Sequence, residues 1–201
     1  MDDILRTAKA CRHYAMCKID FLGGGVCASG LERRYVSFYP EGRMDLYAAL
    51  AEGRVEVTEA AVEIAESCDL CGRCDHQCYF VTEMRPSRVM RALKELVEGR
   101  LARGGPVEKA VPDGPLEEMR KIVGGEWATN DRAIAVTYAH DPGPMTEPRL
   151  PAYVVMPGTR EEVSSLLKLF GRLGLPWVAR GNGSQNAGLS LTDGALSLIH
   201  I

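Results

Sequence analysis

Residues 68–78 have the sequence Cys68-Asp-Leu-Cys71-Gly-Arg-Cys74-Asp-His-Gln-Cys78, and this run dominates the first half of the chain. Its spacing, C-x2-C-x2-C-x3-C, is typical of thiolates that hold iron–sulfur clusters. Three cysteines on one tight loop can occupy three corners of a cluster, and Gly72 gives that loop backbone freedom. The last cysteine lies about one helical turn further on and usually ligates a different cluster. The run therefore predicts an iron–sulfur site.

One position departs from the usual pattern, because Tyr79 stands where a proline normally follows the last cysteine. This change weakens the match without removing a ligand. A structural zinc site and a set of buried free thiols are the alternatives. Zinc is the less favoured of the two metals, since its structural sites use two separated C-x2-C pairs or added histidines.

Three further cysteines, Cys11, Cys17 and Cys27, precede this run. In the same spacing a cysteine is expected at position 14, where Tyr14 stands. Cys27 then takes the role of the fourth cysteine, after an insertion that contains Gly23–Gly25. The alternative is that this first set is degenerate and holds nothing.

Two-cluster proteins exchange their fourth cysteines between clusters. This rule predicts a 4Fe-4S cluster on one ligand set, which is Cys27, Cys68, Cys71 and Cys74. It predicts a second cluster, 3Fe-4S or 4Fe-4S with an open or non-cysteine corner, on Cys11, Cys17 and Cys78. We expect His13 and His76, which flank these ligands, to be solvated loop residues.

Composition limits the classes of protein to which this chain can belong. The chain has 201 residues, a net charge of −3 and no basic stripe, which argues against nucleic-acid binding. No apolar run reaches the length of a membrane span. The seven cysteines are an odd number, and the N-terminus lacks the pattern of an export signal. Because disulfides need an oxidising compartment, we expect free thiols and a cytoplasmic location.

The segment 1–100 has helical periodicity and forms the predicted iron–sulfur module. Expected helices are Met44–Gly53, Thr58–Ser67 and one from Pro86, with Val89, Leu93, Leu96 and Val97 on one face and Gly99 as its stop. Residues 101–147 form the expected connector, with a short helix at Leu116–Val123 and a loop at His140–Pro151.

The later segment 148–195 has a different pattern, strand then helix then strand. The strands are predicted at Ala152–Met156 and Pro176–Arg180, which makes a βαβ unit. Thr159 and Glu162 form a capping box for the helix, and Gly174 ends it. The residues expected on its buried face are Val163, Leu166, Leu167 and Phe170.

A loop rich in glycine, asparagine and serine, residues 180–190, directly follows the second strand. Glycines allow close approach of a ligand, and successive N–H groups can hold a pyrophosphate. Ser184, Asn186 and Ser190 add neutral donors. The spacing is neither G-x-G-x-x-G nor a Walker loop. By itself, such a loop is more often a simple turn than a binding loop.

The segment 148–195 resembles the start of an FAD-binding domain of the vanillyl-alcohol oxidase/PCMH type. The resemblance rests on Pro157 with Glu161-Glu162-Val163, then Arg180-Gly-Asn-Gly183 and Gly188. Asn182 departs from it, since that position is often glycine. The resemblance implies that the loop holds the FAD pyrophosphate, through Arg180, Gly181, Asn182, Gly183, Ser184, Gln185, Asn186, Gly188 and Ser190.

The N-terminal part resembles the helical two-cluster ferredoxin modules of glycolate-oxidase-like and heterodisulfide-reductase-like proteins. Together the two resemblances imply an α+β iron–sulfur flavoprotein related to the D-lactate/glycolate dehydrogenase group. Its expected activity is dehydrogenation of a small-molecule hydroxy acid, with electrons passing from FAD to the clusters and on to a redox partner. The alternatives are a non-catalytic electron-transfer subunit and a zinc-binding interaction module.

The last six residues, Leu196–Ile201, match the translation of a transposase sequencing adapter. We therefore expect adapter read-through there, with the FAD-binding domain incomplete and the catalytic residues beyond residue 195. The alternative is an ordinary β-strand, for which the composition is suitable.

Overall fold

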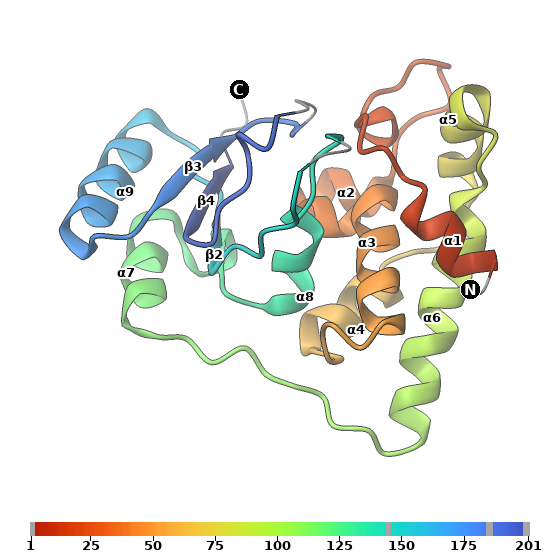
Figure 1. Cartoon of the computed structure of the whole chain (residues 1–201), viewed down its shortest axis with the longest axis horizontal. Helices are drawn as coiled ribbons and strands as arrows, with labels where there is room; N and C mark the ends of the chain where they lie inside the picture. The colour runs from red at the N-terminus through yellow and green to blue at the C-terminus, as the bar shows by residue number, and fades with distance from the viewer. Residues whose placement is uncertain (1–2, 144–145, 184–186, 199–201) are drawn as a thin grey trace. The chain divides into compact units, whose positions relative to one another are not determined.

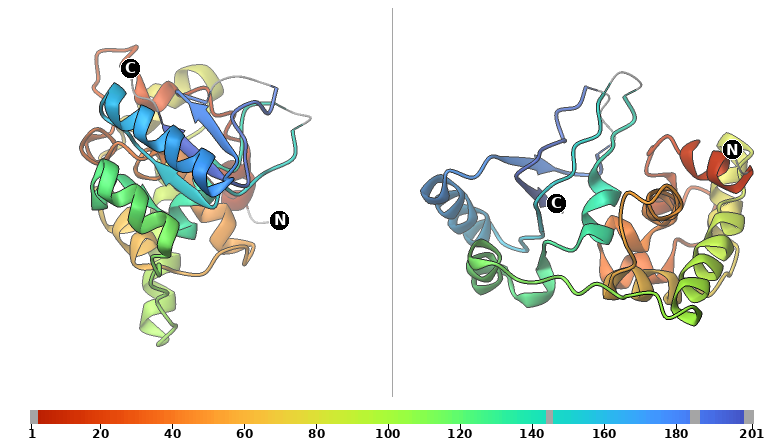
Figure 2. Two further views of the ribbon diagram at one scale, coloured as in Figure 1. Left: turned by 90° about the vertical axis from the view of Figure 1, so that its left-hand side faces the viewer. Right: turned by 60° about the horizontal axis from the view of Figure 1, so that its bottom comes forward.

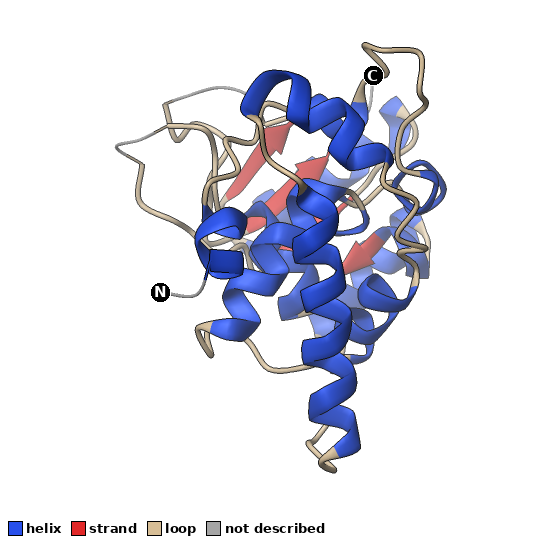
Figure 3. Ribbon diagram, turned by 90° about the vertical axis from the view of Figure 1, so that its right-hand side faces the viewer, coloured by secondary structure: helices blue, strands red, loops and turns tan. Residues whose placement is uncertain are grey.

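The computed structural model describes residues 3–143, 146–183 and 187–198 (Figure 1). The chain divides into two compact units, Met1–Lys109 and Ala110–Ile201. The first is helical and contains all seven cysteines, and the second contains a small four-stranded mixed sheet (Figure 3). Within the described residues, no helix is long and apolar enough to cross a membrane.

Unit 1 is helical. Its elements in chain order are α1 (Asp3–Lys9), η1 (Met16–Lys18), α2 (Ala28–Arg33), η2 (Val36–Phe38), α3 (Pro40–Ala51), α4 (Glu59–Glu66), α5 (Arg73–Thr82) and α6 (Pro86–Ala102). The centre of the unit is α3, which packs against α1, α4 and α6. Its side chains from Pro40 to Leu50 are all buried.

The expected helices are present with shifted ends. α3 begins at Pro40, earlier than predicted, because proline is favoured at a first helical position. Thr58 caps α4, its hydroxyl accepting from the Ala61 amide at 3.1 Å. The predicted stop at Gly99 is wrong. α6 continues to Ala102.

The physical reason for the longer α6 lies in its last turns. Arg100 donates to the Leu50 carbonyl at 2.9 Å and pairs with Glu56 at 3.1 Å, which holds the helix past Gly99. Gly104, two residues after the helix, has a φ of +68°, and the Gly105 amide donates back to the Arg100 carbonyl. This is the hydrogen-bond pattern of a Schellman motif, so the terminating glycine is Gly104.

Unit 2 is built around the sheet. Its elements are α7 (Gly114–Val123), η3 (Gly125–Trp127), β1 (Ala128–Thr129), α8 (Arg132–Ala135), η4 (Val136–Tyr138), β2 (Tyr153–Val155), α9 (Arg160–Leu173), β3 (Trp177–Arg180) and β4 (Ala195–Leu198). The sheet order is β1-β2-β4-β3, with β1 antiparallel and the other strands parallel. Residues expected as a connector thus supply α7, β1 and α8.

The predicted strand–helix–strand unit is present, but its two strands are not neighbours. β4 lies between β2 and β3 and pairs with both, Leu196 aligning with Val154 on one side and Val178 on the other. The segment suspected as adapter read-through thus supplies most of a central strand. Its apolar residues suit that position. The origin of these residues stays a prediction.

The helix between the strands covers one face of this sheet together with α7 (Figures 1 and 2). Its buried residues are Leu166, Leu169 and Phe170, so Leu169 takes the place predicted for Leu167, and Val163 is only half-buried. Thr159 caps it as predicted, while the Glu162 carboxylate accepts from Gly158 instead of Thr159. Gly174 ends it in the left-handed conformation, as predicted.

Candidate functional site

The loop Cys68–Cys74 turns sharply between α4 and α5. Leu70 and Gly72 have φ values of +56° and +80°, and α5 begins at Arg73. Left-handed residues at alternate positions fold the chain into a tight curve. This curve allows three cysteines that are close in sequence to face one space.

The loop Cys11–Cys17 repeats this backbone pattern. His13 and Ala15 have φ values of +52° and +59°, and the short helix η1 begins at Met16. Counted from the first cysteine of each loop, the left-handed residues and the helix start fall at the same positions. Tyr14 takes the position of Cys71, and its side chain is 54% exposed.

Four thiols line one cavity of about 270 Å³, which we call the four-thiol cavity. They come from Cys27 at the start of α2, from Cys68 and Cys71 in the loop, and from Cys74 in α5. Arg43, Ser29 and Ser67 line it as well. The structure therefore brings Cys27 together with three cysteines that lie more than forty residues further along the chain.

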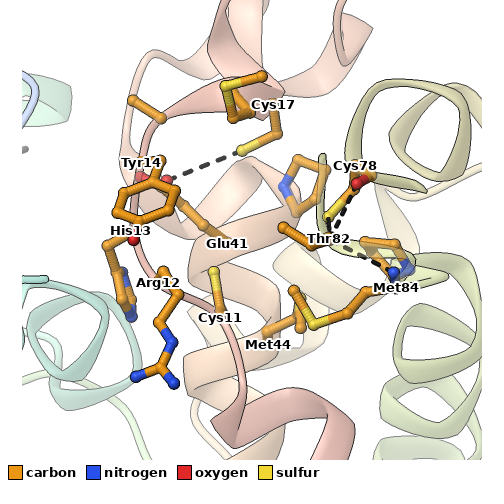
Figure 4. Close-up of a pocket in the computed structure, with 14 residues that line it drawn as sticks. Cys11, Arg12, His13, Tyr14, Cys17, Glu41, Met44, Cys78, Thr82 and Met84 are labelled. Atoms are coloured by element: carbon orange, nitrogen blue, oxygen red, sulfur yellow. Dashed lines mark hydrogen bonds between the residues drawn. The ribbon is translucent and has the colours of Figure 1, made fainter. Parts of the chain in front are cut away.

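The other three thiols, Cys11, Cys17 and Cys78, line a separate cavity of about 40 Å³, the three-thiol cavity (Figure 4). Tyr14 and Glu41 also line it. Figure 4 shows the side chain of Arg12 directed away from the thiols. The division of the seven cysteines between the cavities is the same as the division predicted between two clusters. Ligation itself stays a prediction.

The fit to a metal group depends on the donors and the space. Within the described ranges, no three His, Cys, Asp or Glu side chains are grouped as ligands of a single ion. Zinc draws its sulfur ligands to about 2.3 Å, whereas a cluster is several atoms wide. Thiols spread around a cavity therefore fit a cluster better than one ion. The three-thiol cavity has room for about three waters, so a cluster there requires its walls to move apart.

The cysteines of the four-thiol cavity differ in acidity. Burial alone would raise the pKa of Cys27, but a hydrogen bond with Ser29 and the nearby Arg43 charge outweigh it and lower that pKa. Burial, with a contribution from Asp75, raises the pKa of Cys74 to about 12. Cys27 is therefore predisposed to be a thiolate ligand, while Cys74 must release its proton when metal binds.

All three cysteines of the three-thiol cavity have raised pKa values. Burial is the largest cause for each. The Asp45 and Glu41 carboxylates add to the effect on the pKa of Cys11, and Glu41 adds to that of Cys17. Cys78 hydrogen-bonds with Thr82 at 3.0 Å, which acts in the opposite direction. Without metal, these groups are neutral thiols at physiological pH.

The structure tests or extends the sequence predictions for several side chains near the cysteines. His13 is buried and lies 3.3 Å from Asp45, so the prediction of a solvated loop residue is wrong for it. His76 is exposed, as predicted, but it lies in helix α5 and not in a loop. Sequence reasoning missed Arg43 and Glu41. The signal for them is the presence of three charged residues, Glu41, Arg43 and Asp45, among the mostly apolar residues of α3.

The glycine loop in unit 2 is described in part. Ser184, Gln185 and Asn186 lie outside the described residues. Gly181 and Asn182 are exposed, whereas Gly183 and Ser190 are buried. Arg180 is 3% exposed, and its guanidinium donates to the carbonyls of Tyr138 and His140 at 3.2 Å. Its side chain thus anchors the loop to the preceding segment and does not extend into solvent.

A carboxylate already occupies part of this loop. Asp141 accepts from the Gly188 amide at 2.7 Å, and from Gly143 and the Thr146 hydroxyl. Burial opposes ionisation of Asp141, but the Thr146 and backbone hydrogen bonds outweigh it and lower its pKa. The Gly188 amide is therefore engaged, and Gly181 and Asn182 present the exposed backbone. Sequence reasoning missed Asp141, which lies far from the loop along the chain.

Unit 1 thus groups seven free thiols around two cavities, and unit 2 has a glycine loop after a parallel strand. Two uncharacterized FAD-linked oxidoreductases of Mycobacterium tuberculosis, one from strain CDC 1551 / Oshkosh and one from strain ATCC 25618 / H37Rv, are similar to this chain. Each is 41% identical over 68 residues, which is 34% of this chain and 15% of the relative. The chain therefore spans a small part of these relatives. No protein-family model matches it.

Proposed function

We propose that this chain is part of an FAD-dependent iron–sulfur oxidoreductase that dehydrogenates a hydroxy acid. The observation that carries the proposal is the grouping of seven free thiols around two cavities, four in one and three in the other. The similarity to FAD-linked oxidoreductases supports the flavin part of it.

The four-thiol cavity would hold a 4Fe-4S cluster on Cys27, Cys68, Cys71 and Cys74. The three-thiol cavity would hold a 3Fe-4S cluster, or a 4Fe-4S cluster with one non-cysteine corner, on Cys11, Cys17 and Cys78. Thiolates are the usual ligands of such clusters, and seven free thiols fit a reducing compartment such as the cytoplasm.

The glycine loop would hold the pyrophosphate of FAD. Exposed backbone at Gly181 and Asn182 offers amides for this, with Ser184, Gln185 and Asn186 as further candidates. Arg180 would position the loop from beneath, because its guanidinium is bound to Tyr138 and His140. A bound flavin supplies two-electron oxidation of substrate and one-electron exchange with clusters. We assign no catalytic residue within this chain.

The cluster part is tested by anaerobic purification of the chain. We expect a brown protein with stoichiometric iron and acid-labile sulfide and broad visible absorption. A colourless protein that contains zinc and no sulfide contradicts the proposal and favours the zinc-binding alternative. Colour without sulfide also contradicts it, because a cluster requires both elements.

Because the FAD-binding domain is expected to be incomplete in this chain, the flavin part is tested by titrating the full-length protein that contains it with FAD. Gly181 is the better position to block, since its Cβ would meet nothing, whereas a Cβ at Gly183 would overlap the Arg180 guanidinium. We expect Gly181→Val to weaken binding about tenfold, a loss of about 1.4 kcal/mol. Lys168→Ala, on the exposed side of α9, is the control and leaves binding unchanged. Equal FAD affinity of both variants would show that the loop is a simple turn and does not bind the pyrophosphate.

A further inference from the structure

Helix α3 carries three buried charged residues in its first two turns. Glu41, Arg43 and Asp45 are 4%, 1% and 8% exposed. At about 100° per residue, Glu41 and Asp45 lie close together on one side of the helix and Arg43 on the opposite side. Charged side chains are almost never buried to this extent unless a partner compensates them.

Arg43 faces the four-thiol cavity. Its guanidinium donates to the Cys27 sulfur at 3.4 Å, to the hydroxyls of Ser29 and Ser67 at 2.7 and 2.9 Å, and to the Ile64 carbonyl at 3.0 Å. Among the described residues, none of these partners is a carboxylate. A buried guanidinium without a carboxylate is costly, so the anionic group that offsets it is expected in the cavity itself.

Glu41 faces the three-thiol cavity. One carboxylate oxygen lies 3.8 Å from the Cys17 sulfur (Figure 4). The other pairs with Lys18 at 2.6 Å. Asp45 stands one turn further along the same side and pairs with His13. The two cavities therefore meet opposite charges of one helix.

We propose that α3 shifts the reduction potentials of the two predicted clusters in opposite directions. Arg43 raises the potential of the cluster in the four-thiol cavity, and Glu41 lowers that of the cluster in the three-thiol cavity. This inference rests on the proposed function, since it requires both clusters to be present.

The physical basis is the charge added by reduction. Each cluster gains one negative charge when it accepts one electron, so a nearby cation stabilises the reduced form and a nearby anion destabilises it. A hydrogen bond to a ligand sulfur acts like the cation, and Arg43 supplies both effects at Cys27. Lys18 screens Glu41, but Glu41→Gln still makes the net charge beside the three-thiol cavity more positive by one unit.

The test is a reductive titration of the iron-loaded chain with dithionite, followed by EPR. For Arg43→Gln we expect the oxidised-to-reduced ratio of the four-thiol cluster to rise about tenfold at a fixed potential, about 59 mV for one electron. For Glu41→Gln we expect a smaller shift of opposite sign in the three-thiol cluster. Each variant leaves the other cluster closer to its original potential.

The controls separate charge from structure. Arg43→Lys keeps the charge and loses the forked geometry, so its shift has the sign of Arg43→Gln and a smaller size. Arg54→Gln and Glu59→Gln, both on exposed side chains, leave both potentials unchanged. If Arg43→Gln does not fold, Arg43→Lys and Glu41→Gln decide the question.

The two possible failures are distinguishable. Unmodified chain that takes up no iron and sulfide overturns the proposed function, and this inference with it. Iron-loaded variants whose potentials equal that of the unmodified chain, or shift with the same sign, overturn the inference and leave the proposed function standing.

Discussion

The two cysteine loops of unit 1, residues 11–17 and 68–74, follow the same backbone course with different donor sets. Each has left-handed residues two and four positions after its first cysteine, and a helix five positions after it. The later loop offers three thiols, and the earlier one offers two with Tyr14 between them.

This difference teaches that the shape of the loop does not depend on the middle cysteine. His13, Ala15 and Leu70 adopt the left-handed conformation although each has a Cβ, which costs about 1 kcal/mol or more per residue. Such strain persists where surrounding structure fixes it, and it is concentrated at functional sites. The earlier loop therefore has the backbone course of the later one and offers one thiol fewer.

The largest expected effect comes from removing the middle cysteine where it exists. Cys71→Ser breaks the four-thiol set, and we expect most of the iron in that cavity to be lost. Iron and sulfide per chain, measured after anaerobic purification, check this. Ser67→Cys is not a suitable control because Ser67 contacts Arg43. Ser165→Ala, on an exposed part of α9, leaves the iron content unchanged.

The next test concerns which fourth cysteine serves which loop. Cys78→Ser should lower the amount of cluster bound in the three-thiol cavity and leave the amount in the four-thiol cavity unchanged, because Cys78 lines the three-thiol cavity. Cys27→Ser should do the reverse. EPR spectra of the two variants distinguish the clusters. If each variant instead damages the cluster of its neighbour in sequence, the exchange of fourth cysteines is wrong.

A gain of function tests the earlier loop directly. Tyr14→Cys places a thiol at the position equivalent to Cys71, on a backbone that already has the required form. We expect iron content to rise, or a 3Fe-4S signal to change to that of a 4Fe-4S cluster. Tyr14→Phe, which supplies no ligand, is the matched control. Identical iron content and spectra in both variants would show that position 14 does not supply a ligand to a cluster.

Sequence alone predicted those features that depend on a few neighbouring residues. The caps at Thr58 and Thr159 and the end at Gly174 follow from local hydrogen bonds and backbone angles. The helix stop predicted at Gly99 is wrong because the next residue, Arg100, binds the Leu50 carbonyl and pairs with Glu56. Both partners lie far away in the chain. The position of β4 between β2 and β3 depends on strand pairing, which periodicity does not encode.

The candidate sites show the same division. Spacing identified the cysteines, and the rule for exchanged ligands predicted their grouping. The cysteine spacing gave no indication of Arg43 or Glu41, since their importance comes from burial beside sulfur atoms. Nor did it indicate that Asp141 holds the Gly188 amide. These contacts join segments whose proximity only the fold creates.

The smallest expected effect compares the left-handed positions of the two loops. Gly72→Ala meets no neighbouring atom, so backbone strain is its main effect, and we expect a loss of about 1 kcal/mol in the free energy of unfolding. Ala15→Gly relieves similar strain but removes the methyl group of a residue that is only 3% exposed. Since a buried methyl is worth about 0.8 kcal/mol, the two terms nearly cancel.

Gly99→Ala provides the control for this pair, because it lies inside α6 with an ordinary helical φ and its Cβ would approach only the mobile end of Arg103. We expect it to stabilise the chain by up to about 1 kcal/mol. Urea unfolding followed by circular dichroism measures all three variants. A Gly72→Ala variant as stable as Gly99→Ala would mean that the later loop relaxes without strain, and the shared backbone course would then be no constraint on either loop.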